Sequence, residues 1–239
     1  MLAITSKVFF VRLQRIILIL LGVTAISLWT ANWSLAAPGV NWSIFFAEVN
    51  RQYGSSAVRN AQSWERMLQQ AKAMPDEVDK LKYVNRFFDE FLRYRIDQKN
   101  YGVKDYWAPL AETLARGTGD CEDYAIAKYI TLRLAGIEDR KLRLIYVKAQ
   151  MGGPRSPIFE AHMVLGYYAT PNAEPLILDS LVSLVQKASM RNDLKPVFSF
   201  NSQGLWAGLN VRSTSKPTAR LSKWQKILEQ TAREGISLQ

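Results

Sequence analysis

The sequence is poor in the residues that carry thiol and imidazole chemistry. Its 239 residues contain one cysteine and one histidine. A single cysteine excludes a disulfide within the chain. Any mechanism that couples a thiol to an imidazole can therefore use only Cys121 and His162.

No acidic residue precedes Glu48 in the sequence. Basic residues precede an apolar run at residues 16–29, and the small residues Ser34 to Ala36 follow it. This order is typical of a secretory signal peptide cut after Ala36. An uncleaved membrane anchor is the alternative, because the apolar run is nearly long enough to span a bilayer. We expect residues 1–36 to direct export and residues 37–239 to form one exported domain.

The charge is strongly of one sign, with a formal net charge of +10 at pH 7. A basic exported domain could bind nucleic acid, an anionic surface or an acidic partner protein. Basic and aromatic residues are not interleaved as they are in a nucleic-acid groove, so we expect no nucleic-acid partner.

Helical periodicity precedes strand alternation after residue 37. Apolar spacing and capping residues predict helices over residues 41–54, 56–74, 76–95 and 120–136. Short apolar or alternating segments predict strands over residues 141–149, 161–169 and 176–181, with further sheet over 194–208. The tail from Lys216 is compatible with helix, edge structure or partial disorder. Because there are no repeats and no interior linker, we predict one α+β domain in which helices precede an antiparallel sheet.

Cys121 stands among acids in the segment "GTGDCEDYAIAKYITLRLAG". Asp120 suits the N-cap of the predicted helix and Asp123 follows three residues later, as in a capping box. Cys121 then lies in the first turn, where backbone N–H groups favour an anion. The neighbouring carboxylates oppose that anion. From these residues alone, Cys121 is either a small inert residue or a nucleophile.

His162 begins one predicted strand, and Asp179 ends the next. Two antiparallel strands joined by a short turn can place the carboxylate beside the imidazole and so orient the ring. A thiol on a helix, a base on a strand and an orienting acid form a triad on a papain-like plan. A structural histidine and a turn-forming aspartate are the alternatives.

The acids around Cys121 also form a candidate metal site. Asp120, Glu122 and Asp123 offer hard oxygen ligands that suit Ca²⁺, or they are ordinary first-turn acids of a helix. Their spacing is not that of an EF-hand, so carbonyls, waters or distant side chains such as Asp105 would have to complete the shell. A divalent cation there would cancel the charge that opposes the thiolate.

The same block carries a resemblance to a known family. "GDCEDYAIAKYITLRLAGI", "LRLIYVKA", "AHMVLGYY" and "PLILDSL" are similar to segments of the bacterial transglutaminase-like cysteine proteinases of the LapG type. The resemblance extends from about Trp42 to at least Phe200. It implies a papain/transglutaminase-like fold, with the nucleophile at a helix N-terminus that packs on an antiparallel sheet. It also implies a periplasmic, calcium-dependent cysteine endopeptidase.

By position, the resemblance implies Cys121 as nucleophile, His162 as base and Asp179 as orienting acid. The residues that match the family's calcium ligands are Asp120, Glu122 and Asp123. One departure is Ser180, which follows the triad aspartate where the family commonly has asparagine. This change leaves the triad intact but alters its surroundings.

The resemblance further implies a substrate and a partner. The substrate would be a large repeat adhesin, cut in its N-terminal region beside a pair of alanines, so that its release promotes biofilm dispersal. A LapD-like inner-membrane receptor for cyclic di-GMP would bind and inhibit the protease. Two alternatives remain at this point: acyl transfer to an amine, as in true transglutaminases, and a non-catalytic exported binding module.

Overall fold

The computed structural model describes residues 37–207 and 221–238. The predicted signal peptide or anchor, residues 1–36, lies outside these ranges. Within them, no helix has both the length and the apolar character required to cross a bilayer. From Pro38 onward, the described residues belong to one unit.

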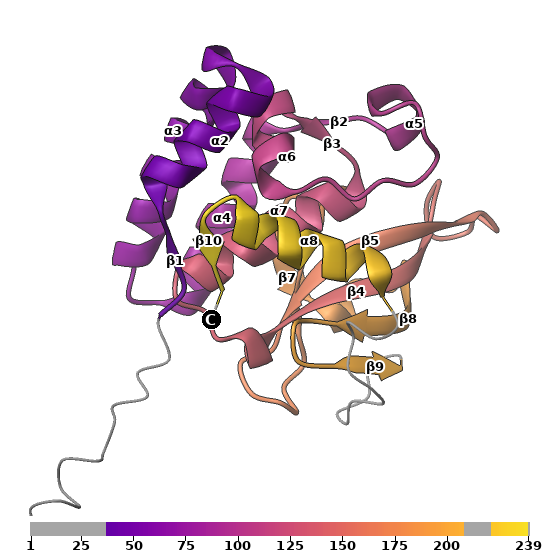
Figure 1. Cartoon of the computed structure of the whole chain (residues 1–239). Coiled ribbons are helices and arrows are strands. Elements are labelled where there is room, and N and C mark those ends of the chain that lie inside the picture. The colour runs from indigo at the N-terminus through magenta and orange to yellow at the C-terminus, as the bar shows by residue number, and fades with distance from the viewer. Residues whose placement is uncertain (1–36, 208–220, 239) are drawn as a thin grey trace, which may run out of the picture. The chain divides into compact units, whose positions relative to one another are not determined.

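The first helices form as their capping residues predict (Figure 1). Asn41 caps the first of them by accepting a hydrogen bond from the backbone N–H of Ile44 at 3.3 Å. Gly54, with φ of +83°, ends the same helix in a conformation that favours glycine. The helices are α2 (Trp42–Tyr53), α3 (Ser55–Ala73) and α4 (Glu77–Phe91).

Helix α4 ends earlier than the sequence predicts, at Phe91 and not at Arg95. The chain becomes extended at Leu92, and strand β2 (Arg93–Tyr94) pairs in parallel with β3 (Thr118–Gly119). Arg93 and Arg95, which belong to the predicted helix, therefore lie beyond its observed end. Pairing with the segment before Cys121 outweighs the local helical pattern, and it places the chain after β2 beside the start of the cysteine helix.

Six strands of the described ranges form one antiparallel sheet in the order β7-β6-β5-β4-β8-β9. Their bounds are β4 (Leu142–Gln150), β5 (Phe159–Tyr167), β6 (Leu176–Leu178), β7 (Gln186–Lys187), β8 (Leu194–Phe200) and β9 (Leu205–Ala207). Leu165 of β5 pairs with Leu178 of β6. The antiparallel pairing of β5 with β6 and the α+β class are confirmed, and each predicted strand is present, but β6 ends at Leu178 and not at residue 181 as predicted.

Helix α7 (Cys121–Leu134) lies in the core between the sheet and the other helices. It packs against β4 and β5 on one side and against α3, α4 and α6 (Leu110–Arg116) on the other. Nearly every residue of α7 is buried, because the sheet covers the helix on one side and other helices cover it on the other. Gly136, with φ of +94°, ends it as predicted, and the N–H of Ile137 bonds the carbonyl of Leu132 at 3.0 Å.

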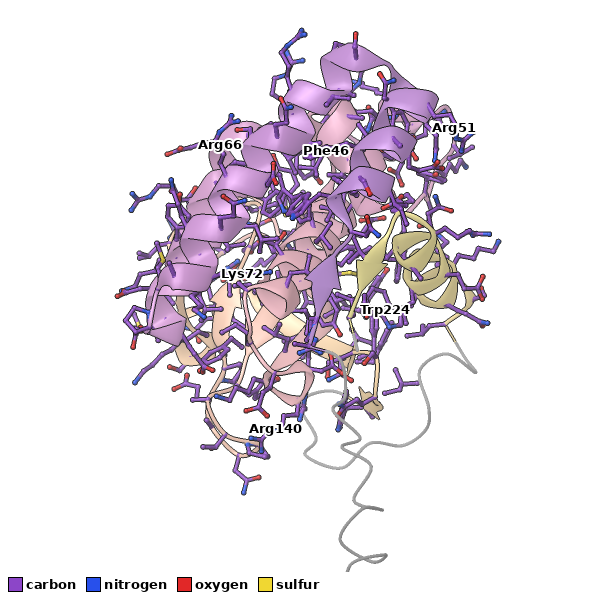
Figure 2. All side chains as sticks on the ribbon, turned by 60° about the vertical axis from the view of Figure 1, so that its left-hand side comes forward. Phe46, Arg51, Arg66, Lys72, Arg140 and Trp224 are labelled. Atoms are coloured by element: carbon purple, nitrogen blue, oxygen red, sulfur yellow. The ribbon has the colours of Figure 1, made fainter. Side chains whose placement is uncertain are left out.

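The C-terminal tail forms helix α8 (Ser222–Arg233) and strand β10 (Ile236–Ser237). Strand β10 pairs with β1 (Gly39–Val40) in antiparallel fashion. Trp224 of α8 is fully buried and donates its indole N–H to the carbonyl of Asn201 at 3.1 Å. Figure 2 shows this side chain directed into the domain, whereas Arg66 of α3 projects away from it. Through the pairing of β10 with β1, the C-terminal tail thus contacts the beginning of the described domain.

Candidate active site

Cys121 and His162 line the same cleft, which has a volume of about 700 Å³. Cys121 comes from the start of α7 and His162 from β5. The short helix α5 (Asp97–Asn100) and the segment before α6 supply the acidic side, through Asp97 and Asp105. Tyr94 and Trp107 add apolar wall. The two residues predicted to share one mechanism are therefore brought to one open site.

Cys121 is the first residue of α7, and its environment opposes ionisation. Its thiol donates a hydrogen bond to Oε2 of Glu122 at 2.9 Å. Burial, followed by the charges of Glu122 and Asp120, raises the pKa of the thiol well above its usual value. The backbone N–H of Met163, the residue after His162, acts in the opposite direction on that pKa. The acids therefore oppose the thiolate, as the sequence predicts.

His162, the fourth residue of β5, and Asp179, the residue that follows β6, are buried together. His162 Nε2 lies 2.6 Å from Asp179 Oδ1. Burial disfavours the charged carboxylate, but the contacts with His162, the N–H of Leu181 and Arg191 outweigh it and lower the pKa of Asp179 to about 2. An ionised carboxylate can only accept, so Nε2 must carry the proton. Nδ1 is then the ring nitrogen left to act as a base.

Arg191 is a site residue that the sequence analysis does not single out. It donates from Nη2 to Asp179 Oδ2 at 2.7 Å. It lies 12 residues beyond Asp179, at the end of the 3₁₀ turn η2 (Ala188–Met190), where no periodic pattern marks it. A lone basic residue in a turn gives no signal, and only the fold brings it to the aspartate.

Acidic side chains from two segments converge beside the thiol. Carboxylate oxygens of Asp97, Asp120 and Asp123 lie within 4.8 Å of one another, and so do those of Asp97, Asp105 and Glu122. The sequence predicts four of these residues and misses Asp97. Asp97 stands alone in a polar segment, and only the pairing of β2 with β3 carries it to the start of α7.

Asp123 also has a structural role in the turn before α7. Its Oδ1 accepts the N–H of Ala108 at 2.8 Å, and its Oδ2 accepts the N–H of Asp120 at 3.4 Å, within the predicted capping box. Gly119 leaves room for this carboxylate, because a Cβ there would lie 2.7 Å from the Asp123 Cβ. Burial is the main reason that the pKa of Asp123 rises to about 8.

The acidic group has features that fit a bound cation. Asp97 Oδ1 and Asp120 Oδ1 are buried and accept no hydrogen bond from the described part of the chain. Burial, then the charges of Glu122 and Asp123, raise the pKa of Asp120 to about 9. Buried carboxylates with spare oxygens are hard ligands of the kind that Ca²⁺ prefers. The residues present therefore fit calcium.

Comparison with known proteins places the chain in a family. Residues 49–192 match the family described as bacterial transglutaminase-like cysteine proteinase BTLCP. The structure resembles EGTA-treated LapG of Legionella pneumophila, with 36% identity, a TM-score of 0.69, and coverage of 81% of this chain and 99% of that one. It also resembles calcium-bound LapG of the same organism, with 36% identity, a TM-score of 0.64, and coverage of 78% and 97%. No curated protein sequence matches significantly.

Proposed function

The chain belongs to the bacterial transglutaminase-like cysteine proteinases, and on that premise we propose that it is a calcium-dependent cysteine endopeptidase. Cys121 is the nucleophile, His162 the base and Asp179 the acid that orients the imidazole. The observation that carries the proposal is the 2.6 Å contact between His162 and Asp179 beside a cleft that the only cysteine also lines.

Catalysis begins with transfer of the thiol proton to Nδ1 of His162. In the structure, the thiol of Cys121 donates a hydrogen bond to Glu122, so the side chain must first rotate from that carboxylate toward the imidazole. Cys121 Sγ then attacks the scissile carbonyl, and His162 returns the proton to the leaving amine. The N–H of Cys121, which has no partner within its own helix, is placed to stabilise the oxyanion. Water then attacks the thioester as His162 takes its proton; the carbon–sulfur bond breaks, the carboxyl product leaves, and the proton on His162 returns to the sulfur of Cys121.

Asp97, Asp120, Glu122 and Asp123 would hold Ca²⁺, with Asp105 at the edge of the group. When bound, Ca²⁺ would supply positive charge that offsets the acids and favours the thiolate. Glu122 supports this proposal because it belongs to the acidic group and also holds the thiol. Similar proteins that were solved in calcium-bound and EGTA-treated forms support the choice of metal.

The substrate we propose is a large repeat adhesin on the bacterial surface. The protease would cut its N-terminal region near a pair of alanines and release it, which promotes biofilm dispersal. We place the protein in the periplasm, either free or held by an N-terminal anchor, and propose a LapD-like cyclic di-GMP receptor as its inhibitor. The family membership and the export pattern in residues 1–36 support these assignments.

The direct experiment incubates the protein with a recombinant N-terminal fragment of a large repeat adhesin from the same cell. We expect two products by mass spectrometry when Ca²⁺ is present, and none with Cys121→Ala or His162→Ala. Continued cleavage by Cys121→Ala would exclude the proposed nucleophile. An intact chain with release of ammonia would instead indicate acyl transfer.

A further inference from the structure

We propose that Arg191 is a positioning residue for this reaction, holding the Asp179 carboxylate so that the His162 ring stays in the tautomer that leaves Nδ1 free. The inference rests on the proposed function, because it assigns a role to Arg191 within the proposed triad. Arg191 does not line the cleft that holds Cys121, so it acts only through Asp179.

The two oxygens of Asp179 are held by different segments. Oδ1 faces His162 Nε2 at 2.6 Å and also accepts the N–H of Leu181 at 3.0 Å. Oδ2 accepts Nη2 of Arg191 at 2.7 Å. Both oxygens of the carboxylate are therefore held. Among the hydrogen bonds between described residues, only the one from Arg191 reaches Oδ2, the oxygen that does not face the imidazole.

Arg191 is itself held by two hydrogen bonds to Asp193. Its Nε donates to Oδ1 of Asp193 at 2.9 Å, and its Nη2 donates to Oδ2 at 2.7 Å. The carbonyl of Asp193 accepts the N–H of Gln150, the last residue of β4, at 2.8 Å. The guanidinium is thus linked through Asp193 to β4, one of the two central strands of the sheet. A planar fork can serve two carboxylates in this way, whereas an ammonium is a point charge.

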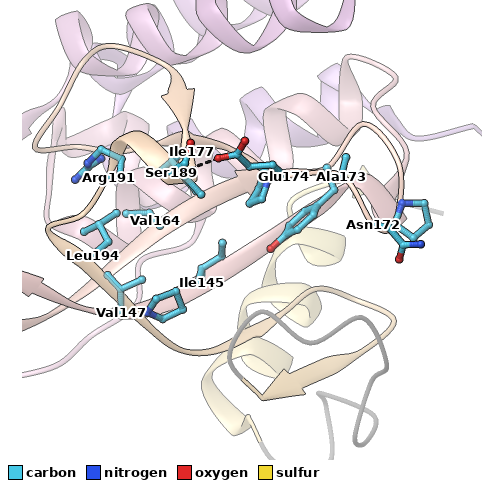
Figure 3. Close-up of a pocket in the computed structure, with 15 residues that line it drawn as sticks. Ile145, Val147, Val164, Asn172, Ala173, Glu174, Ile177, Ser189, Arg191 and Leu194 are labelled. Carbon is cyan, nitrogen blue, oxygen red and sulfur yellow. Dashed lines mark hydrogen bonds between the residues drawn. The ribbon is translucent and has the colours of Figure 1, made fainter.

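The remaining nitrogen of Arg191 gives the reason to assign a role beyond stability. Arg191 is only 4% exposed, yet its Nη1 is buried without a partner among the described residues. Figure 3 shows Arg191 at one end of an apolar groove of about 510 Å³, whose lining includes Val164 and Leu194. A buried N–H without a partner is costly. The guanidinium is placed to reach Asp179, although this position leaves one of its own nitrogens unpaired.

The role follows from the chemistry of a buried carboxylate. The terminal torsion of aspartate is broad, so an unheld carboxylate can turn away from the ring. A buried carboxyl also tends to take up a proton. A protonated Asp179 could donate to Nε2 and so shift the ring proton to Nδ1, the atom needed as base. Arginine stays protonated in proteins, so Arg191 keeps Asp179 as an acceptor only.

The test uses the single histidine of the chain, in a protein without a polyhistidine tag. With ¹⁵N-labelled histidine, the two ring nitrogens of His162 give the only imidazole signals. We expect the parent protein to show the Nε2–H tautomer, and Arg191→Met to show signals averaged between tautomers. We also expect Arg191→Met to lower kcat about 10- to 100-fold with KM unchanged, as for loss of a hydrogen bond to a charged group.

Two further variants make the result decisive. Arg140→Met removes an exposed arginine that pairs only with Glu138 in the described structure, and it should leave both readouts unchanged. Arg191→Lys keeps the charge but not the fork, and its tautomer signals and kcat should fall between parent and Arg191→Met. If Arg191→Met does not fold, Arg191→Lys gives the same test.

The proposal is overturned if a folded Arg191 variant keeps the parental tautomer signals and the parental kcat. The nuclear magnetic resonance measurement needs no substrate. A protein that cuts no adhesin but loses the Nε2–H tautomer on substitution of Arg191 would therefore count against the proposed function, and not against the positioning role.

Discussion

Asp97 and Asp120 lie together in the acidic group although 23 residues separate them in the sequence: the backbone N–H of Asp97 donates to Oδ2 of Asp120 at 3.3 Å. Each of the two carboxylates also has a buried Oδ1 that accepts no hydrogen bond from the described residues. Burial raises the pKa of both carboxyl groups. Like charges held this closely repel each other unless a proton or a cation offsets them, which is consistent with the calcium site proposed above.

Asp97→Asn is expected to weaken Ca²⁺ binding by about tenfold or more, because calcium sites depend on the number of charged ligands. Isothermal titration calorimetry measures the change. Glu160→Gln is the matched control, since Glu160 lines the same cleft but belongs to none of the acidic groups that could hold a metal. Equal affinity of Asp97→Asn and the parent protein would remove Asp97 from the site.

Ca²⁺ is expected to raise the melting temperature of the Cys121→Ala variant, which separates binding from catalysis. At a free concentration of about 100 times the Kd, a bound ligand adds about 2.7 kcal/mol to the free energy of unfolding. For a domain of this size, each kcal/mol corresponds to about 2–4 °C. Differential scanning calorimetry in Ca²⁺ and in EGTA measures the shift, and identical transitions would exclude a calcium site of useful affinity.

Gly119→Ala is expected to disturb the metal site, whereas Gly117→Ala is not. A Cβ at residue 119 would lie 2.7 Å from the Cβ and 2.9 Å from Oδ2 of Asp123, so that carboxylate must shift. A Cβ at Gly117 meets nothing within 4 Å, although φ of +60° strains the backbone by about 1 kcal/mol. Both variants should lose stability, but only Gly119→Ala should also lose Ca²⁺ affinity. Loss of affinity in both would assign the effect to the turn as a whole.

Glu234 is expected to give the domain a pH-dependent stability. Burial is the main reason that its pKa rises from 4.5 to about 7, and the charges of Glu48 and Glu112 add to the effect. Between pH 4.5 and about 7, the folded state is therefore expected to hold a proton that the unfolded chain has released. Stability from this group is greatest below pH 4.5 and falls as the pH rises to about 7. Glu234→Gln should be more stable than the parent by up to about 3 kcal/mol at pH 8, with no gain at pH 4.

Urea denaturation of Glu234→Gln at pH 4 and pH 8 measures this gain. Glu229→Gln changes an exposed glutamate of α8, the helix that ends just before Glu234, and serves as the control. A gain for Glu234→Gln that is the same at both pH values would show that the substitution acts through packing and not through the proton.

Much of the fold could be predicted because local patterns and tertiary contacts agree. Asn41, Gly54 and Gly136 mark helix ends that the structure confirms. His162 and Asp179 could be placed together because consecutive antiparallel strands bring their residues side by side. The end of α4 could not be predicted, since its last turn is replaced by pairing with a segment more than 20 residues further along the chain.

The parts of the candidate site that could not be predicted come from isolated residues in irregular segments. Asp97 reaches the acidic group through the β2–β3 pairing, and Arg191 reaches Asp179 through the turn before β8. Neither residue forms part of a periodic pattern or a motif. The sequence also does not indicate that Glu122 would accept the thiol hydrogen bond of Cys121.

The central claim is that Cys121 is a nucleophile whose ionisation depends on calcium, and its alkylation rate tests this most directly. Because the chain has one cysteine, mass spectrometry of iodoacetamide-treated protein reports Cys121 alone. We expect faster alkylation at neutral pH in Ca²⁺ than in EGTA, and loss of this difference in Asp97→Asn. Equal rates in Ca²⁺ and EGTA, both no faster than that of a model peptide, would contradict the account.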